Sequence, residues 1–305
     1  MRMSHCLKRF AVLLALGLPS ATWSQSADAA RVFDYPPAVC PGCAAWSMPQ
    51  QPLKIFGNTW YVGTRGLSAI LITSEQGHIL VDGGLPASAP KIVANIRALG
   101  FLVEDVRLIV NSHDHFDHAG GIAELQRASG AEVAASPASA PVIRSGRSGR
   151  DDPQFGLVLA YEPTPRVRTI ADGETLRVGP LAVTAHFTPG HTPGGTTWSW
   201  RSCEGNVCED IVYADSQTPV SADGFFFTRS KEYPGALADF ERSFTVLEQL
   251  RCDILLTPHP SASNLWERLD GRGTAALVDA GACKRYAAGA RTALARRIAT
   301  ERSAP

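Results

Sequence analysis

The sequence lacks an excess of charge of either sign. Its 29 lysine and arginine residues balance 29 aspartate and glutamate residues, so the formal net charge at pH 7 is zero. There is no basic block either. The stretch at 144–150 carries three arginines among serines and glycines, and we interpret it as a solvated loop. Because nucleic-acid binding depends on clustered lysine and arginine that neutralise phosphates, these absences argue against nucleic acid as a partner.

Long apolar runs are also lacking beyond the N-terminus, and no later segment is apolar over the length that crosses a bilayer. Near the N-terminus, a positively charged stretch precedes an apolar run at 10–18, and residues 19–30 are rich in small side chains. This order is typical of a secretory signal peptide and is too short for a membrane span. We therefore predict a signal peptide over residues 1–26, cleaved close to its end, and a periplasmic mature chain of one domain over residues 27–305.

Cysteine is sparse but informative. The predicted mature chain keeps six of the seven cysteines, and an even number in an exported protein predicts three disulfides. Cys203 and Cys208 would close a short hairpin-like loop. Cys40 and Cys43 form a C-x-x-C motif, which can also be a redox or zinc motif. Here it lies in a proline-rich segment without a βαβ unit, and this favours a structural bond.

Histidine is scarce, with only 8 residues in the sequence, yet three of them lie close together. The run at 113–118 reads H-x-H-x-D-H and contains His113, His115, Asp117 and His118. Imidazole and carboxylate together suit zinc, and a run this short lets several side chains converge on one ion. A polar surface loop with a chance cluster is the alternative, but the scarcity of histidine elsewhere favours a metal site.

The sequence around this cluster is that of a ligand loop in an α/β fold. A short apolar run at 107–111 predicts a buried strand before it, and a helical pattern follows it. His191 follows a strand-like run at 181–187, and His259 follows another at 253–257, each in a turn that contains proline. Either histidine alone would be interpreted as an ordinary loop residue. Together with the cluster, they indicate three strand ends that converge at one sheet edge.

Hydrophobic periodicity predicts a chain of strands and helices with a single core, and apolar residues make up 45% of the sequence. The predicted strands lie near 59–63, 68–74, 78–82, 107–111, 131–135, 174–178, 181–187, 196–201, 209–214 and 253–257. The predicted helices lie at 87–99, 119–129, 137–144, 237–251 and 283–301. The strands fall into two groups, each followed by helices, which indicates an α/β or α+β fold.

Four motifs carry a resemblance to a known family: the I-L-V-D-G-G segment, the H-x-H-x-D-H loop, G-H-T around His191 and P-H at His259. They resemble the metallo-β-lactamase superfamily over roughly residues 55–260. The ligand set is similar to that of subclass B3. Ser216 stands where subclasses B1 and B2 have a metal-binding cysteine, and His113 stands where B2 has asparagine. The resemblance implies a four-layer αββα sandwich, with two sheets packed face to face and helices outside.

The same resemblance implies a metal centre with two Zn2+ ions per chain. Three residues would hold each ion: His113, His115 and His191 the first, and Asp117, His118 and His259 the second. Six ligands leave each zinc with an open position, as a catalytic site needs. A hydroxide shared by the two ions would be the nucleophile, and Asp117 would hold it in line as the catalytic carboxylate.

The implied reaction is zinc-dependent hydrolysis of the β-lactam amide bond, an activity that confers antibiotic resistance. The implied partners are small-molecule β-lactams, namely penicillins, cephalosporins and carbapenems, and the implied acting form is a monomer. Ser216 and Thr218 resemble hydroxyls that bind the substrate carboxylate, and Gln154 resembles a glutamine that lines the pocket in some members. The alternative for all three is an ordinary polar loop residue.

Two aspartates and two cysteines complete the implied set. Asp82 would hydrogen-bond the ligand loop and fix its geometry, and its alternative is a simple turn aspartate. In glyoxalase II, an aspartate at about the position of Asp215 bridges the two metals. In the B3 pattern the matching aspartate is not a metal ligand, so we do not predict Asp215 as one. Cys252 and Cys283 resemble the disulfide typical of B3 enzymes. That bond would pin the last helix and leave the C-x-x-C cysteines as a local pair.

Three other functions are alternatives. A glyoxalase-II-like thioesterase or a lactonase would share the fold, and a periplasmic zinc-binding protein without catalysis would share the ligands. A serine β-lactamase would use Ser88 and Lys91, which fit S-x-x-K, but S-D-N and K-T-G are absent. Export, disulfides, Ser216 and the glycines at 194–195 favour the metallo-β-lactamase.

Overall fold

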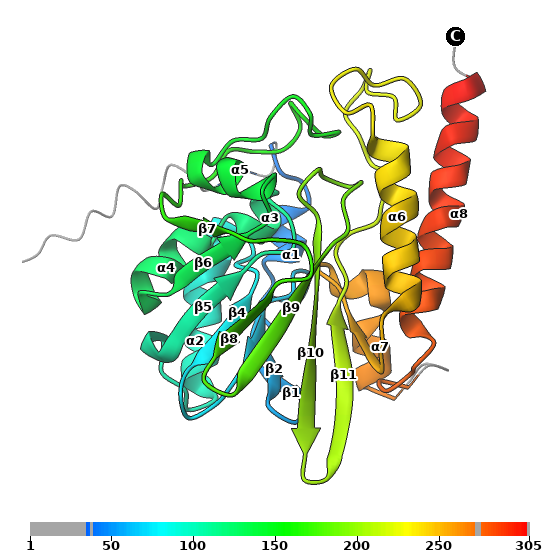
Figure 1. Ribbon diagram of the computed structural model, residues 1–305. Coiled ribbons are helices and arrows are strands. Elements are labelled where there is room, and N and C mark those ends of the chain that lie inside the picture. The colour runs from blue at the N-terminus through cyan, green and yellow to red at the C-terminus, as the bar shows by residue number, and fades with distance from the viewer. Residues whose placement is uncertain (1–34, 37–38, 272–275, 304–305) are drawn as a thin grey trace, which may run out of the picture. The chain divides into compact units, whose positions relative to one another are not determined.

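Two β-sheets packed face to face form the centre of the protein (Figure 1). The structure is a computed structural model that describes residues 35–36, 39–271 and 276–303. These residues belong to one compact unit, Phe33–Pro305, whereas the predicted signal peptide at 1–26 lies outside the described residues. No helix within the described ranges is long and apolar enough to cross a membrane.

The first sheet has seven strands in the order β1-β2-β3-β4-β5-β6-β7. Strands β1 to β4 pair antiparallel, and β4 to β7 pair parallel. Their bounds are β1 Leu53–Phe56, β2 Thr59–Tyr61, β3 Ile70–Ile72, β4 His78–Val81, β5 Val106–Val110, β6 Glu132–Ala135 and β7 Val167–Thr169. Every residue of β4 is buried, because this strand is covered on both faces, as is usual for parallel strands.

The second sheet has five strands in the order β12-β11-β10-β9-β8. Strand β12 runs parallel to β11, and the other pairs are antiparallel. The bounds are β8 Thr175–Val178, β9 Leu181–Phe187, β10 Thr196–Glu204, β11 Val207–Tyr213 and β12 Ile254–Leu256. Strands β10 and β11 form a long hairpin, and Cys203 and Cys208 face each other near its tip.

Side chains alternate between the two faces of each strand and thereby build three apolar layers. Between the sheets, Val81 and Val110 of the first sheet share a core with Trp198 of the second. On the outer face of the first sheet, Leu80 belongs to a separate core with the helices. On the outer face of the second sheet, Leu255 belongs to a third core. Three cores between four layers confirm the predicted αββα sandwich.

Helices supply the two outer layers (Figure 1). The first sheet is covered by α2 Ala89–Ala98, α4 Ile122–Ser129 and α5 Ser139–Ser145, and the second by α6 Ala236–Gln249 and α8 Ala282–Ser303. Shorter helices are α1 Cys43–Trp46, α3 Phe116–Ala119 and α7 Leu265–Leu269, with 3-10 turns at Pro86–Ser88, Val103–Asp105 and Pro260–Ser263. The buried side chains of α6 include Phe240, Phe244 and Leu247, which form the predicted core-facing stripe.

The three predicted disulfides are present in the structure. Cys40 pairs with Cys43, and the hairpin cysteines pair with each other. Cys252 pairs with Cys283 across 31 positions and joins the start of α8 to the chain just before β12. This last bond ties the C-terminal helix to the second sheet.

Several elements differ from the predictions. The helix predicted at 119–129 is wrong at its start, because a separate helical turn, α3, begins at Phe116 inside the H-x-H-x-D-H run. Strands β1 and β7 were not predicted. Two of the three residues of β7 are exposed, so this edge strand leaves no apolar pattern in the sequence.

Candidate metal centre

The six predicted metal ligands lie in loops and one short helix at one end of the two sheets. They are His113 and His115 after β5, Asp117 and His118 in α3, His191 in the β9–β10 turn, and His259 after β12. The ends of β4 and β5 pair in the first sheet, and the ends of β11 and β12 pair in the second. The site is therefore assembled from both sheets.

Three histidines form the first group of ligand atoms. Atoms of His113, His115 and His191 lie within 4.8 Å of one another, and all three side chains are buried. Nε2 of His113 is buried without a hydrogen-bond partner among the described residues, a costly state unless an ion fills the space before it. Burial and the neighbouring His115 lower the pKa of His191 to about 3, so this ring is neutral, which is the form that binds metal. The group fits a metal ion.

Asp117 lies at the centre of a second group. Its Oδ2 atom is 3.3 Å from Nε2 of His118 and 3.2 Å from Nε2 of His259. Ligand atoms of His113, Asp117 and His118 again lie within 4.8 Å of one another, so the two groups adjoin. Burial would raise the pKa of Asp117, but the His118 and His259 imidazoles hold it well below its usual range. A carboxylate oxygen facing two imidazole nitrogens fits a second metal ion.

Two aspartates orient two of these histidines from behind. Nδ1 of His113 lies 2.7 Å from Oδ1 of Asp215, and Nε2 of His115 lies 2.9 Å from Oδ2 of Asp152. Such partners fix the ring orientation and raise the basicity of the nitrogen that faces the metal. Neither aspartate was predicted for this role, because Asp215 is 102 positions from His113 and Asp152 is 37 positions from His115. No local sequence pattern links residues so far apart.

His191 is oriented by the segment that follows β11. Its Nδ1 atom donates to the carbonyl oxygen of Thr218 at 2.8 Å, and Oγ1 of Thr218 is 3.2 Å from the same nitrogen. Thr218 therefore fixes the orientation of the His191 ring from its Nδ1 atom and leaves Nε2 for a metal. Gln154 is half-buried, and its Nε2 atom lies 3.4 Å from Nε2 of His191, the nitrogen left for a metal. Ser216 is buried in the same segment as Thr218.

Asp82 fixes the start of the ligand loop. It follows β4 with a φ of 62°, and its Oδ1 atom accepts from the backbone N–H of Ser112 at 2.7 Å and from Nδ2 of Asn111 at 3.1 Å. Its Oδ2 atom accepts from the hydroxyls of Ser112 and Tyr213 at 2.7 and 2.8 Å. These bonds hold in place the two residues that precede His113.

The second sheet holds the same two residues from the other side. Nε1 of Trp198 in β10 donates to the carbonyl oxygen of Asn111 at 3.0 Å. The backbone N–H of Thr196, also in β10, donates to the carbonyl oxygen of Ser112 at 2.7 Å. The position of the ligand loop therefore depends on how the two sheets pack.

Aromatic side chains of the N-terminal segment border the metal groups. Trp46 in α1 contacts His259, with ring centroids 5.3 Å apart, and lies 6.5 Å from the ring of Phe116. Tyr35 contacts Phe116 at 5.3 Å. The described part of the N-terminal segment thus forms an apolar wall beside His259.

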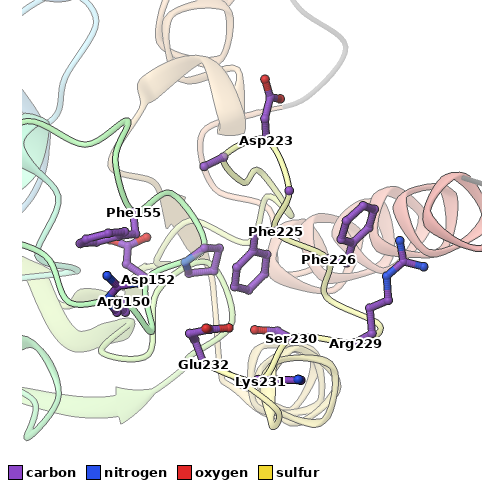
Figure 2. A pocket seen from close by; sticks show the side chains of 13 residues that line it. Arg150, Asp152, Phe155, Asp223, Phe225, Phe226, Arg229, Ser230, Lys231 and Glu232 are labelled. Atoms are coloured by element: carbon purple, nitrogen blue, oxygen red, sulfur yellow. The ribbon is translucent and has the colours of Figure 1, made fainter. Parts of the chain in front are cut away.

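A pocket of about 430 Å³ adjoins the metal groups on the side of Asp152. It is lined by residues 150, 152, 153 and 155 after α5 and by residues 222–226 and 229–232 before α6. Figure 2 shows Asp152 and Phe155 of the first segment on one side of the pocket. Phe225 of the second segment also lines it. Asp152 also contacts His115, so this one residue joins the pocket to a predicted ligand.

A family model described as the metallo-beta-lactamase superfamily matches residues 62–259, and the chain belongs to this superfamily. All six predicted ligands fall within the matched range. Family membership and the two groups of histidine and aspartate side chains together imply a bound metal. The family predicted from the sequence motifs is confirmed.

Two solved structures place the chain more closely. It is 55% identical to Rm3 metallo-beta-lactamase, with a TM-score of 0.84 over 87% of this chain and 99% of that chain. It is 50% identical to MEM-A1, a subclass B3 metallo-beta-lactamase isolated from a soil metagenome library, with a TM-score of 0.82 over 85% of this chain and 99% of that chain. These similarities confirm the resemblance to subclass B3.

Curated relatives are more distant. A probable metallo-hydrolase of Burkholderia pseudomallei is 33% identical over 113 residues, which are 37% of this chain and 36% of that protein. A hydroxyacylglutathione hydrolase of Rhodospirillum rubrum is 25% identical over 130 residues, which are 42% of this chain and 41% of that protein. The chain thus matches less than half the length of these relatives.

Proposed function

We propose that this protein is a zinc-dependent hydrolase of the β-lactam amide bond, active on penicillins, cephalosporins and carbapenems and able to confer antibiotic resistance. One observation carries the proposal. Five buried ligands form two groups that share His113, half-buried His259 lies 3.2 Å from Oδ2 of Asp117, and Nε2 of His113 has no protein partner among the described residues. The chain that carries these groups is 55% identical to a metallo-β-lactamase.

Two Zn2+ ions fit the side chains. The atoms that would hold them are Nε2 of His113, Nδ1 of His115 and Nε2 of His191 for one, and Oδ2 of Asp117, Nε2 of His118 and Nε2 of His259 for the other. In the first set, the other nitrogen of each ring is already hydrogen-bonded. When bound, zinc supplies a Lewis acid for the lactam carbonyl and lowers the pKa of water so that it attacks near neutral pH.

The chain's own residues position the reactants. Asp117 directs Oδ2 at two imidazoles, so its other carboxylate oxygen is available to accept a hydrogen bond from the attacking water and hold it in line. The amide of Gln154, beside His191, would donate to a substrate oxygen. The hydroxyls of Ser216 and Thr218 would bind the substrate carboxylate. A solvent proton would complete the step at the departing lactam nitrogen, without a covalent enzyme intermediate.

The substrate contacts give a kinetic prediction. Replacing Ser216 and Thr218 together by alanine should raise KM about tenfold and change kcat less, because hydroxyls that bind ground state and transition state alike contribute uniform binding. The Thr218 hydroxyl also lies 3.2 Å from Nδ1 of His191, so it has two candidate roles: binding substrate and orienting that histidine. The single variant Thr218→Ala shows how much of the effect of the double variant comes from this residue. Steady-state kinetics on a cephalosporin provide the measurement. An unchanged KM in the double variant would show that neither hydroxyl binds the substrate.

A glyoxalase-II-like thioesterase or a lactonase of the same fold is the second candidate. The hydroxyacylglutathione hydrolase match favours it, but Asp215 lies against His113 rather than between the two groups of ligand atoms. Turnover of a chromogenic cephalosporin, a thioester and a lactone by the zinc-loaded protein distinguishes the two. Thioester or lactone cleavage without cephalosporin cleavage would refute the β-lactamase proposal, and cephalosporin turnover that resists a chelator would indicate serine chemistry instead.

We further propose that the protein is exported to the periplasm by the signal peptide at 1–26 and acts there as a monomeric single domain, 27–305. Three disulfides in the described residues fit an oxidising compartment. Mass spectrometry of the exported protein should find a new N-terminus close to residue 27, and an intact N-terminus in a periplasmic extract would contradict the cleavage.

A further inference from the structure

The segment at 219–230, between β11 and α6, has no helix or strand of its own. It follows directly after Thr218, whose carbonyl oxygen accepts from His191. Within the segment, the backbone forms only local turns, such as the bond from the N–H of Phe225 to the carbonyl oxygen of Ala222 at 3.2 Å. A segment of this kind needs contacts from elsewhere to hold one conformation.

Glu301, near the end of α8, supplies two of these contacts. It is only 2% exposed, and its two carboxylate oxygens accept from the backbone N–H groups of Phe227 and Thr228 at 3.0 and 2.9 Å. Burial would raise the pKa of Glu301, but Arg297 and the backbone N–H groups lower it below its usual range, so it remains a carboxylate at neutral pH. A buried charged acceptor makes these bonds stronger than bonds between neutral groups.

Arg297, one helical turn earlier, supplies two more. Its Nη2 atom donates to Oγ of Ser221 at 2.7 Å and to the carbonyl oxygen of Phe225 at 2.9 Å, and its Nε atom donates to Glu301 at 2.7 Å. Its guanidinium also lies 5.4 Å from the ring centroid of Phe227. Arg297 and Glu301, which we call the α8 anchor, therefore hold both halves of the segment.

The anchored segment is joined to the other loop that supports the metal groups. The backbone N–H of Ala222 donates to the carbonyl oxygen of Pro153 at 2.8 Å. Pro153 is flanked by Asp152, the partner of His115, and by Gln154, which lies 3.4 Å from Nε2 of His191. The pocket of about 430 Å³ is lined by residues of both loops (Figure 2). Phe225 and Phe227 also pack in the third core, with Phe240 of α6. The bond to Pro153 and the α8 anchor add the polar contacts that hold the backbone on either side of these rings.

We infer that Arg297 and Glu301 are positioning residues for the reaction: the α8 anchor fixes the segment at 219–230, and through it the places of Thr218 and Gln154, so that it sets the affinity for substrate. The kinetic part of this inference rests on the proposed β-lactam hydrolysis. The structural part does not.

The test compares Glu301→Gln with Arg296→Gln in the full zinc-loaded mature protein. Glutamine keeps the shape of Glu301, but its amide nitrogen donates, so one of the two backbone N–H groups loses its acceptor and Arg297 loses its charge partner. Arg296 is exposed on the same helix and serves as the matched control. Hydrogen exchange of the backbone amides at 219–230 should be about tenfold faster in Glu301→Gln and unchanged in Arg296→Gln.

Cephalosporin kinetics on the same variants supply the second readout. We expect KM to rise about fivefold to tenfold in Glu301→Gln with kcat within about twofold, because the reacting groups stay in place while the substrate-binding loop loosens. Ser221→Ala, which removes a single bond to Arg297, should shift KM in the same direction by a smaller factor. It also keeps the test valid if Glu301→Gln folds poorly.

The outcomes separate the inference from the proposed function. Unchanged exchange at 219–230 in folded Glu301→Gln and Ser221→Ala would refute the anchor, and faster exchange with an unchanged KM would refute its role in substrate affinity. If the wild-type protein cleaves no β-lactam, the proposed function fails, and KM is then read on whichever thioester or lactone the protein cleaves. Exchange still decides whether the anchor exists.

Discussion

Replacing Asp117 with asparagine is expected to lower kcat for a chromogenic cephalosporin by about 10²–10⁴-fold while the protein stays folded, which is the usual loss when a positioned proton acceptor is removed. Asparagine preserves the shape of the side chain. It replaces one carboxylate oxygen by an amide that donates, and it removes the charge that faces His118 and His259. Both the alignment of the attacking water and the second metal group depend on that charge.

Asp114→Asn is the matched control for this variant. Asp114 is buried in the same loop, but its Oδ1 atom accepts from the hydroxyl of Ser139 at 2.6 Å, and it belongs to neither group of ligand atoms. Asparagine can still accept that bond, so we expect kcat to change by no more than about tenfold. Zinc content, measured by elemental analysis, should fall in Asp117→Asn and not in the control. Equal losses of kcat in the two variants would contradict a catalytic role for Asp117.

Removal of zinc should abolish β-lactam turnover and also lower the melting temperature by about 10 °C. A ligand present at a thousand times its Kd stabilises the folded state by about 4 kcal/mol, and each kcal/mol shifts the melting temperature of a chain of this size by about 2–4 °C. The folded protein should lose this stability without zinc because buried imidazoles then lie close together with no ion between them. Nε2 of His113 has no other partner among the described residues. Calorimetry before and after treatment with a chelator measures the shift.

Metal readdition provides the control for this experiment. Zinc should restore both activity and melting temperature, at close to two ions per chain, whereas magnesium should restore neither, because a set of five imidazoles and one carboxylate suits zinc and not a hard cation that prefers oxygen. Full turnover in the metal-free protein, or recovery with magnesium alone, would overturn the assignment of the six ligands.

The sequence could point to the residues that the structure brings together in the candidate metal centre, because their signals are local. His113, His115 and Asp117 lie in one run, and His191 and His259 each follow a strand-like run in a turn. Apolar periodicity likewise indicated most strands and helices. The number of layers and the pairing of Cys252 with Cys283 came from the resemblance, because spacing alone does not fix which sheet faces which.

The supporting contacts could not be predicted, because they depend on how distant segments pack. Asp215 reaches His113 from the second sheet, and Asp152 reaches His115 from a loop after α5. Thr218 was predicted to face the substrate, yet its carbonyl oxygen also orients His191. In each case the fold decides which residue reaches the histidine. In the sequence, that residue cannot be told from an ordinary polar loop residue.

The bonds from β10 to Asn111 and Ser112 have a consequence for biosynthesis. The ribosome makes the H-x-H-x-D-H run well before Thr196 and Trp198, and His259 later still. A partly synthesised chain therefore has neither the strand that aligns its first histidines nor the remaining ligands. High-affinity metal binding therefore requires that the chain through His259 has been made and that both sheets have packed, which in an exported protein places metal binding after translocation.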